Sequence, residues 1–312
     1  MRAIVIDADP GQDDAIAILL ALACPDRLDL KMISTVAGNV AVAQTTANAM
    51  RILDLAGQTK IPVHAGMPRP LVEPLETAEF VCGPDGLAGA NLPPPRMHAS
   101  ATHAVDAIVA TVRAAAPGEI TLCALGPLTN LAMALRLAPD IAPRLRQIVL
   151  MGGALGLGNM TPAAEFNIYV DPHAAHIVFG AGVPLAMFGL QVTHQALVSV
   201  AHMHRLAAIA TPVAAAVYGM LTRPRPGGLG TKAHPMHDPC VIAWLLWPEL
   251  FTGQDCHVTI QTEGDLRGRT TIDWNNRWRR PPNAFVADSV QAGPLFDRMI
   301  DALARLTGSR SP

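Results

Sequence analysis

Four carboxylate side chains stand within eight consecutive residues near the start of the chain. They are Asp7, Asp9, Asp13 and Asp14. Like charges this crowded repel one another, and burial without compensation would raise their pKa values. A divalent cation removes that repulsion, and all-oxygen ligands favour calcium or magnesium over zinc. The alternative is a turn and an N-capped helix with solvated carboxylates, but four acids directly after an apolar strand favour a metal site.

Two later segments pair an acid with a neighbouring polar side chain. Glu165 and Asn167 are separated by one residue, so in an extended chain they share a face and could bond sugar hydroxyls. The edge of a polar loop is the alternative. His237 stands beside Asp238 and could deliver a proton near neutral pH. Asp238 could equally be a helix N-cap, with Pro239 at the first helical position.

The elements around these residues alternate between short apolar strands and helices. Strands are predicted at residues 3–6, 28–36, 120–125, 147–151 and 184–188, and helices at residues 13–23, 41–55, 104–115 and 128–137. This alternation predicts an α/β fold with an open, mostly parallel, Rossmann-like sheet and helices on both faces.

The later part of the chain is less regular. We predict helices over residues 204–221, 236–247 and 290–306, and a small β-hairpin within residues 258–272. Residues 223–234 are rich in Gly and Pro, which favours a loop that closes as a lid over substrate. The Pro-rich run 92–96 fits a loop inside a domain, because strand-helix units continue on both sides of it. We therefore expect a single domain over residues 1–312.

The polar segments share one position relative to the predicted strands. Asp7 and Asp9 follow the first strand, Asn39 follows the second, and two further strands end at Leu125 and Met151. In an open parallel sheet the carboxyl ends of the strands meet at one edge, where ligands bind. Residues far apart in the sequence are therefore expected to line a single cleft.

Composition argues against several classes of function. Half of the 312 residues are hydrophobic, 15% are charged and the formal net charge is −2, so no basic surface for nucleic acid is expected. No apolar run is long enough to span a bilayer, and the apolar run before Asp7 is too short for a signal-peptide core. The five cysteines show no CxxC spacing and no even disulfide framework. Buried thiols in a reducing cytoplasm are expected.

Taken in order, these motifs resemble those of the inosine-uridine preferring nucleoside hydrolases. Residues 7–14 match the family pattern Asp-x-Asp-Pro-Gly-x-Asp-Asp. Further blocks that resemble the family occur in the expected order at residues 37–39, 125–130, 151–153, 158–167, 237–239 and 267–270. The resemblance therefore spans nearly the whole chain.

The resemblance implies a calcium-dependent N-ribohydrolase of nucleoside salvage, which cleaves the bond between ribose and nucleobase. It assigns the calcium ion to the carboxylates of Asp9, Asp14 and Asp238 and to the backbone carbonyl of Leu125. Asp9 would also be the general base, and His237 would serve the departing nucleobase. The ribose would be held by Asp13, Asn39, Asn159, Glu165, Asn167 and Asp238, with Met151 lining the sugar site and Asp7 supporting the loop from behind.

One position departs from the family pattern. The family often has His at the start of a His-Gly-x-x-Gly-Leu block, where this sequence has Cys82. Cys is a poorer hydrogen-bond donor, so the departure concerns the base-recognition side of the pocket. That side is expected to include Cys82, Tyr218 and residues 223–234, which do not predict whether the base is a purine, a pyrimidine or modified.

Two other functions are compatible with parts of the sequence. Phosphatases of the haloacid dehalogenase type also carry Asp-x-Asp after a strand, but here Pro10 and Gly11 follow Asp9. A non-catalytic nucleoside or sugar binder could use the same scaffold, but nothing is missing from the catalytic set. The sequence favours a hydrolase of small ribonucleosides, which the resemblance predicts to be a homodimer or homotetramer.

Overall fold

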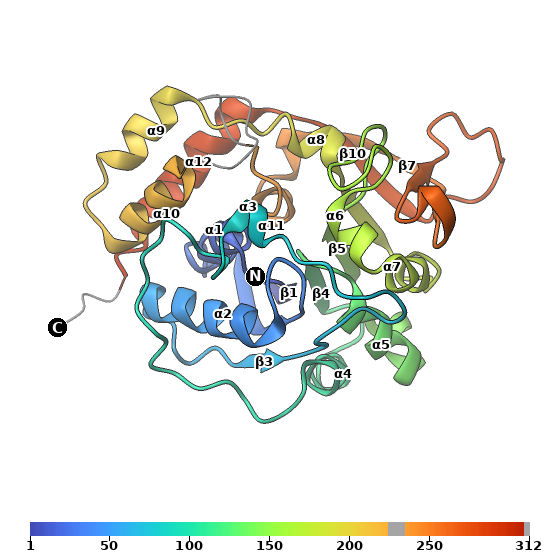
Figure 1. Ribbon diagram of the computed structural model, residues 1–312, viewed down its shortest axis with the longest axis horizontal. Helices are drawn as coiled ribbons and strands as arrows, with labels where there is room; N and C mark the ends of the chain where they lie inside the picture. The colour runs from blue at the N-terminus through green and yellow to red at the C-terminus, as the bar shows by residue number, and fades with distance from the viewer. Residues whose placement is uncertain (224–234, 309–312) are drawn as a thin grey trace.

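The computed structural model describes residues 1–223 and 235–308. Its centre is an eight-stranded sheet in the order β3-β2-β1-β4-β5-β6-β10-β7 (Figure 1), parallel throughout except for the antiparallel pair β10 and β7. The predicted hairpin is present as a separate two-stranded antiparallel sheet. The strands are β1 (Arg2–Ala8), β2 (Leu28–Thr35), β3 (Val63–Ala65), β4 (Ile120–Ala124), β5 (Gln147–Met151), β6 (Leu185–Phe188), β7 (Phe251–Cys256), β8 (Val258–Ile260), β9 (Thr270–Ile272) and β10 (Ala284–Val290).

Helices cover both faces of the sheet, as predicted. In Figure 1, α1, α2, α10 and α12 lie on one side of the strands, and α4, α5 and α7 lie on the other. The α-helices are α1 (Gln12–Leu22), α2 (Val42–Ala56), α3 (Glu79–Cys82), α4 (Ala104–Ala114), α5 (Thr129–Leu137), α6 (Phe166–Val170), α7 (Pro172–Phe179), α8 (Leu190–Thr193), α9 (Val200–Ala207), α10 (Pro212–Thr222), α11 (Pro239–Leu246) and α12 (Ala292–Arg305). In the described part of the chain, short 3₁₀ helices span Pro139–Arg144, Pro248–Leu250 and Gly264–Leu266.

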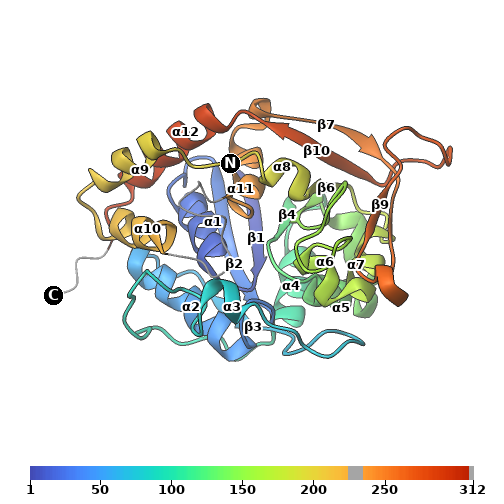
Figure 2. The same ribbon diagram turned by 45° about the horizontal axis from the view of Figure 1, so that its top comes forward.

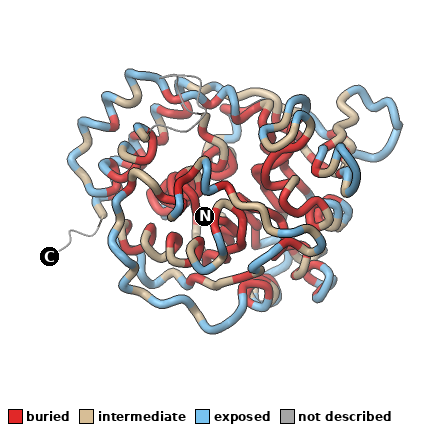
Figure 3. Tube along the Cα trace, in the orientation of Figure 1, coloured by how far each residue is buried: buried red, intermediate tan, exposed pale blue. Residues whose placement is uncertain are grey.

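The hydrophobic core forms one layer on each face of the sheet. Successive side chains of a strand point to opposite faces, so Ile4 and Ile6 pack with α1, α2 and α11, whereas Ala3 and Val5 pack with α4, α5 and α7. A strand buried on both faces needs a continuous apolar run, and residues 3–6 supply one. Figure 3 shows the resulting buried centre, with exposed residues concentrated in the outer helices and loops.

The predicted helix over residues 204–221 is wrong, because two helices occupy this region. Helix α9 ends at Ala207, and α10 begins at Pro212. Pro212 has no N–H to continue a helical ladder, and the Thr211 hydroxyl accepts a hydrogen bond from the Ala214 N–H at 3.1 Å. The Thr-Pro pair therefore starts a new helix.

Two strands near the end of the chain were not predicted. Strand β7 has four of its six residues at least partly exposed, and β10 contains Asp288 and Ser289, so neither shows a clear apolar run. They extend the sheet beyond β6 as an antiparallel pair along its upper edge in Figure 2. The closing helix consequently begins at Ala292, and Val290 belongs to β10.

Smaller predictions have different outcomes. All five cysteines are buried free thiols, as expected. Among the described helices, none is long and apolar enough to cross a membrane. In the predicted lid, residues 224–234 lie outside the described residues.

Candidate active site

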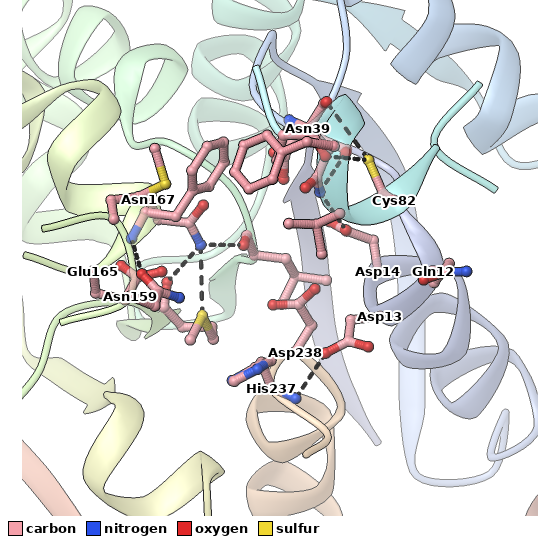
Figure 4. Close-up of a pocket in the computed structure, with 18 of the residues that line it drawn as sticks. Gln12, Asp13, Asp14, Asn39, Cys82, Asn159, Glu165, Asn167, His237 and Asp238 are labelled. Atoms are coloured by element: carbon pink, nitrogen blue, oxygen red, sulfur yellow. Dashed lines mark hydrogen bonds between the residues drawn. The ribbon is translucent and has the colours of Figure 1, made fainter. Parts of the chain in front are cut away.

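A pocket of about 300 Å³ opens at the carboxyl ends of the central strands (Figure 4). Asp13, Asp14 and Asn39 face Asn159, Glu165 and Asn167 across it. All predicted metal-binding, substrate-binding and catalytic residues line this one pocket: Asp9, Asp13, Asp14, Asn39, Leu125, Met151, Asn159, Glu165, Asn167, His237 and Asp238. The expected convergence is therefore observed, and the role of each residue stays a prediction.

Asp9 is held between two loops that approach it closely. The Asn39 N–H donates to Asp9 Oδ2 at 2.6 Å. A β-carbon at Gly38 would lie 2.1 Å from Asp9 Oδ2, and one at Gly126 would lie 2.5 Å from Asp9 Oδ1. Glycine at both positions therefore leaves room for the carboxylate, because any larger side chain would displace it.

Asp14 lies in the first turn of α1, where the positive end of the helix dipole favours a carboxylate. Its Oδ2 atom accepts hydrogen bonds from Gly11 N at 3.0 Å and Asn39 Nδ2 at 3.3 Å. Its Oδ1 atom is buried and has no hydrogen-bond partner among the described residues. One carboxylate oxygen is thus anchored, and the other is left to interact with a ligand.

His237 and Asp238 connect the start of α11 to the start of α1. The His237 N–H donates to Asp13 Oδ2 at 2.9 Å, and the ring Nδ1 lies 2.8 Å from Thr193 Oγ1. Pro239 is the first residue of α11, and Asp238 occupies the N-cap position. In the described chain the Asp238 side chain makes no capping bond. Instead it lines the same pocket as Asp14, close enough for the charge of Asp14 to add to burial in raising the pKa of Asp238.

The expectation that Glu165 and Asn167 lie in extended chain is wrong. Asn167 lies in helix α6, and Glu165 is its N-cap, accepting a hydrogen bond from Ile168 N at 3.3 Å. Asn167 Nδ2 donates to the carbonyl oxygens of Leu125 at 2.7 Å and Met151 at 3.1 Å. Both residues line the pocket, but a helical turn places them there.

Two supporting polar residues complete the loops around the site. Asn159 Oδ1 accepts the Phe166 N–H at 2.9 Å and so fixes the loop before α6. Asp7 is buried behind the pocket, where its Oδ1 accepts from Ser34 Oγ at 2.5 Å and Asn130 Nδ2 at 2.8 Å. Its position agrees with the predicted support from behind.

The electrostatic character of the pocket is strongly acidic. Five carboxylates line it, and no Lys or Arg of the described residues does. Burial, reinforced by the charge of Asp14, raises the pKa values of Asp9 and Asp238 well above the usual range. Burial also raises the pKa of Asp14 to about 6 and that of Glu165 to about 7. The pocket therefore favours a cation or a developing positive charge.

Cys82 lies at the edge of the same pocket. Its thiol donates to the Ala78 carbonyl at 3.1 Å, and burial together with the charge of Asp9 raises its pKa to about 12. Cys82 is therefore a neutral side chain at neutral pH, which argues against a nucleophilic role. Tyr218 is not among the described residues that line the pocket.

Several pocket residues were missed by the sequence reasoning. His194 follows α8, just beyond β6, and its ring packs edge-on against that of His237 with centroids 5.6 Å apart. The rule that ligands bind beyond strand ends, applied to β6, would have indicated it. The other missed residues are Gln12, Ala78, Phe80, Val81, Met160 and Phe166.

Comparison with known proteins identifies the family. The family model described as inosine-uridine preferring nucleoside hydrolase matches residues 4–297. The chain belongs to this family. A pyrimidine-specific ribonucleoside hydrolase of Shewanella sp. (strain ANA-3) is 44% identical to this nucleoside hydrolase over 314 residues, covering 98% of the chain and 97% of the relative.

Solved structures support the same assignment. The purine-preferring ribonucleoside hydrolase from Gardnerella vaginalis has a TM-score of 0.89 and 30% identity, covering 98% of this chain and 99% of that one. A plant nucleoside hydrolase has a TM-score of 0.88 and 34% identity, with the same coverage of both chains. The predictions of the family, the fold and an enzyme are confirmed, and both alternative functions are disfavoured.

Proposed function

We propose that this nucleoside hydrolase uses a calcium ion and water to cleave the N-glycosidic bond of ribonucleosides. The observation that carries this proposal is the convergence of five carboxylates in a pocket that no described Lys or Arg lines. Its volume of about 300 Å³ suits a small ligand. Breaking the bond gives the ribose oxocarbenium character, which the surrounding carboxylates stabilise.

The donor set fits a hard cation. The buried Asp14 Oδ1 has no hydrogen-bond partner in the described chain, and Asp9, Asp238 and the Leu125 carbonyl offer further oxygens in the same pocket. Among the described residues, no group of three or more His, Cys, Asp or Glu side chains could hold a metal ion by itself. We therefore assign Leu125 and the substrate hydroxyls to the ligand set as well, which suits Ca²⁺ with its about six to eight oxygens.

The side chains of the pocket divide the reaction between them. A calcium ion would orient the attacking water and lower its pKa. The Asp9 carboxylate accepts the proton of that water. Since Nδ1 of His237 is engaged with Thr193 Oγ1, we assign Nε2 as the atom that protonates the departing base. The remaining polar residues hold the ribose, namely Asp13, Asn39, Asn159, Glu165, Asn167 and Asp238, with Met151 lining the sugar site.

We extend the proposal to pyrimidine ribonucleosides. The relative at 44% identity is named for pyrimidine specificity, whereas the structures named for purine and for inosine-guanosine substrates are each 30% identical to this chain. Cys82 places a small neutral thiol at the edge of the pocket.

The test is release of free base from uridine, cytidine, inosine, adenosine and guanosine, with and without a chelator. We expect uridine or cytidine to be hydrolysed fastest, chelation to abolish activity and calcium to restore it. Buried groups left unpaired by a missing hydroxyl should reject 2′-deoxyuridine by on the order of 10⁴-fold. Full activity after exhaustive chelation would contradict the cation, and equal rates on deoxynucleosides would contradict the ribose site.

We further propose that the chain works as a single domain in the cytoplasm, as a homodimer or homotetramer. Five buried free thiols support a reducing compartment. Sedimentation equilibrium of the purified protein distinguishes the two assemblies, and a monomer at micromolar concentration would contradict both.

A further inference from the structure

We propose that Thr270, on the β8–β9 hairpin, is a positioning residue that fixes the turn after β5 and, through it, the Glu165 carboxylate. Thr270 does not line the pocket formed by the described residues. It belongs to the Arg-Gly-Arg-Thr block at residues 267–270, to which the proposed reaction gives no role. The inference rests on the proposed ribonucleoside hydrolysis and adds a residue to it.

Thr270 satisfies both backbone groups of one residue in the turn. Its hydroxyl accepts from the Ala154 N–H at 2.9 Å and donates to the Ala154 carbonyl at 2.7 Å. Thr270 and Ala154 are buried and lie 116 positions apart in the sequence. Both backbone groups would be left buried without this hydroxyl, so the pair of bonds holds the turn in one place.

The same turn contacts Glu165 directly. Gly153 precedes Ala154, has a left-handed φ of 77°, and its N–H donates to Glu165 Oε2 at 2.9 Å. A β-carbon at Gly153 would lie 2.7 Å from Thr270 Cγ2, so the hairpin packs closely against the turn. A shift of Ala154 would therefore move the N–H that orients the Glu165 carboxylate.

The loop directly before Thr270 contacts α6, the helix that Glu165 caps. A β-carbon at Gly268, whose φ is 79°, would lie 2.6 Å from Tyr169 Cα in α6. The Arg267 guanidinium lies 4.0 Å from the centroid of the Tyr169 ring and is paired with Glu73 and Glu76. Figure 2 shows β9 running beside α7, the helix that follows α6. The hairpin and its loop therefore contact both the turn after β5 and α6, the two elements that position Glu165.

The experiment is a double-mutant cycle on the purified full chain. Thr270→Val keeps the shape of the side chain and removes both hydrogen bonds, whereas Thr270→Ser keeps them. Thr121→Val is the matched control, because Thr121 is fully buried in β4 and its hydroxyl has no partner among the described residues. Each variant is assayed on the best ribonucleoside, alone and combined with Glu165→Gln.

We expect Thr270→Val to lower kcat/KM by about 10- to 100-fold, since a small misplacement of a binding group has an effect of this size. Thr270→Ser and Thr121→Val should stay within about threefold of the wild type. In the Glu165→Gln background, Thr270→Val should lower kcat/KM by less than about threefold. The effects of coupled residues are not additive, so the second substitution has little left to remove. Additive losses, or equal losses for Ser and Val, would overturn the proposal.

A second variant covers the case in which Thr270→Val does not fold. Arg267→Met removes the ion pair between the loop before Thr270 and Glu73, at a partly exposed position. It should reduce kcat/KM in the wild type but not in the Glu165→Gln background. Additivity there overturns the inference. A wild-type protein that hydrolyses no ribonucleoside would instead defeat the proposed function, so the two failures are distinguishable.

Discussion

At the scale of single residues, the geometry of the pocket depends on two glycines, which have no side chain. Gly38 and Gly126 stand on either side of Asp9, and a β-carbon at either position would overlap its carboxylate. The acid is therefore aimed by steric exclusion as well as by the hydrogen bond from Asn39. This arrangement makes the glycines testable parts of the site.

We predict that Gly38→Ala lowers kcat/KM by about 10²-fold, since its methyl group would force Asp9 out of the productive geometry. Gly156→Ala is the matched control, because a β-carbon there meets nothing within 4 Å. Steady-state kinetics with calcium present measures both variants. Retention of wild-type kinetics by Gly38→Ala would show that Asp9 does not need its present position.

The sequence located the predicted site residues because strand ends in a parallel sheet share one edge. It could not supply the local conformation of each segment. Glu165 and Asn167 were expected in extended chain, yet one caps a helical turn and the other lies within it. Such a turn of five residues is too short to show a helical period, so tertiary contacts decide its shape.

At the scale of elements, the strands buried on both faces were predictable and the exposed ones were not. Strand β1 contains a continuous apolar run. In β7, apolar and polar residues do not alternate regularly, and the strand forms by pairing with β10. Pairing between distant segments leaves no mark in a local pattern. The break between α9 and α10 was visible in the sequence, since Thr211 and Pro212 form a typical N-cap and first helical residue.

The cap at Thr211 yields a prediction for the stability of α10. Thr211→Ala removes the hydrogen bond to Ala214 N and should lower the free energy of unfolding by about 1 kcal/mol. Thr211→Ser, which keeps the hydroxyl, should remain close to the wild type. Urea denaturation followed by circular dichroism measures all three proteins, and equal midpoints for Ala and Ser would contradict the capping role.

At the scale of the whole molecule, the buried acids make stability depend on pH. Burial raises the pKa values of Asp7 and Glu165 to about 7 in the folded state, above the value of about 4 expected when unfolded. Their protonated forms therefore stabilise the fold fully below about pH 4, and this contribution is lost as the pH rises through about 7.

We predict that, in the presence of a chelator, the Tm falls as the pH is raised from about 5 to about 8. Calcium should raise the Tm most at the upper end of this range, because a cation that binds only the folded state stabilises it. Differential scanning fluorimetry tests both effects, and Glu165→Gln should show a shallower slope. A Tm that increases with pH under chelation would refute the assignment.

The bond between His237 and Asp13 joins positions 224 residues apart. During synthesis on the ribosome, the first acidic loop therefore emerges long before the segment that completes the pocket. A nascent chain that has not yet released residue 238 lacks part of the proposed calcium ligand set and one wall of the cleft. The proposed metal and nucleoside binding would therefore require that the chain beyond residue 238 has emerged and folded against the first loop.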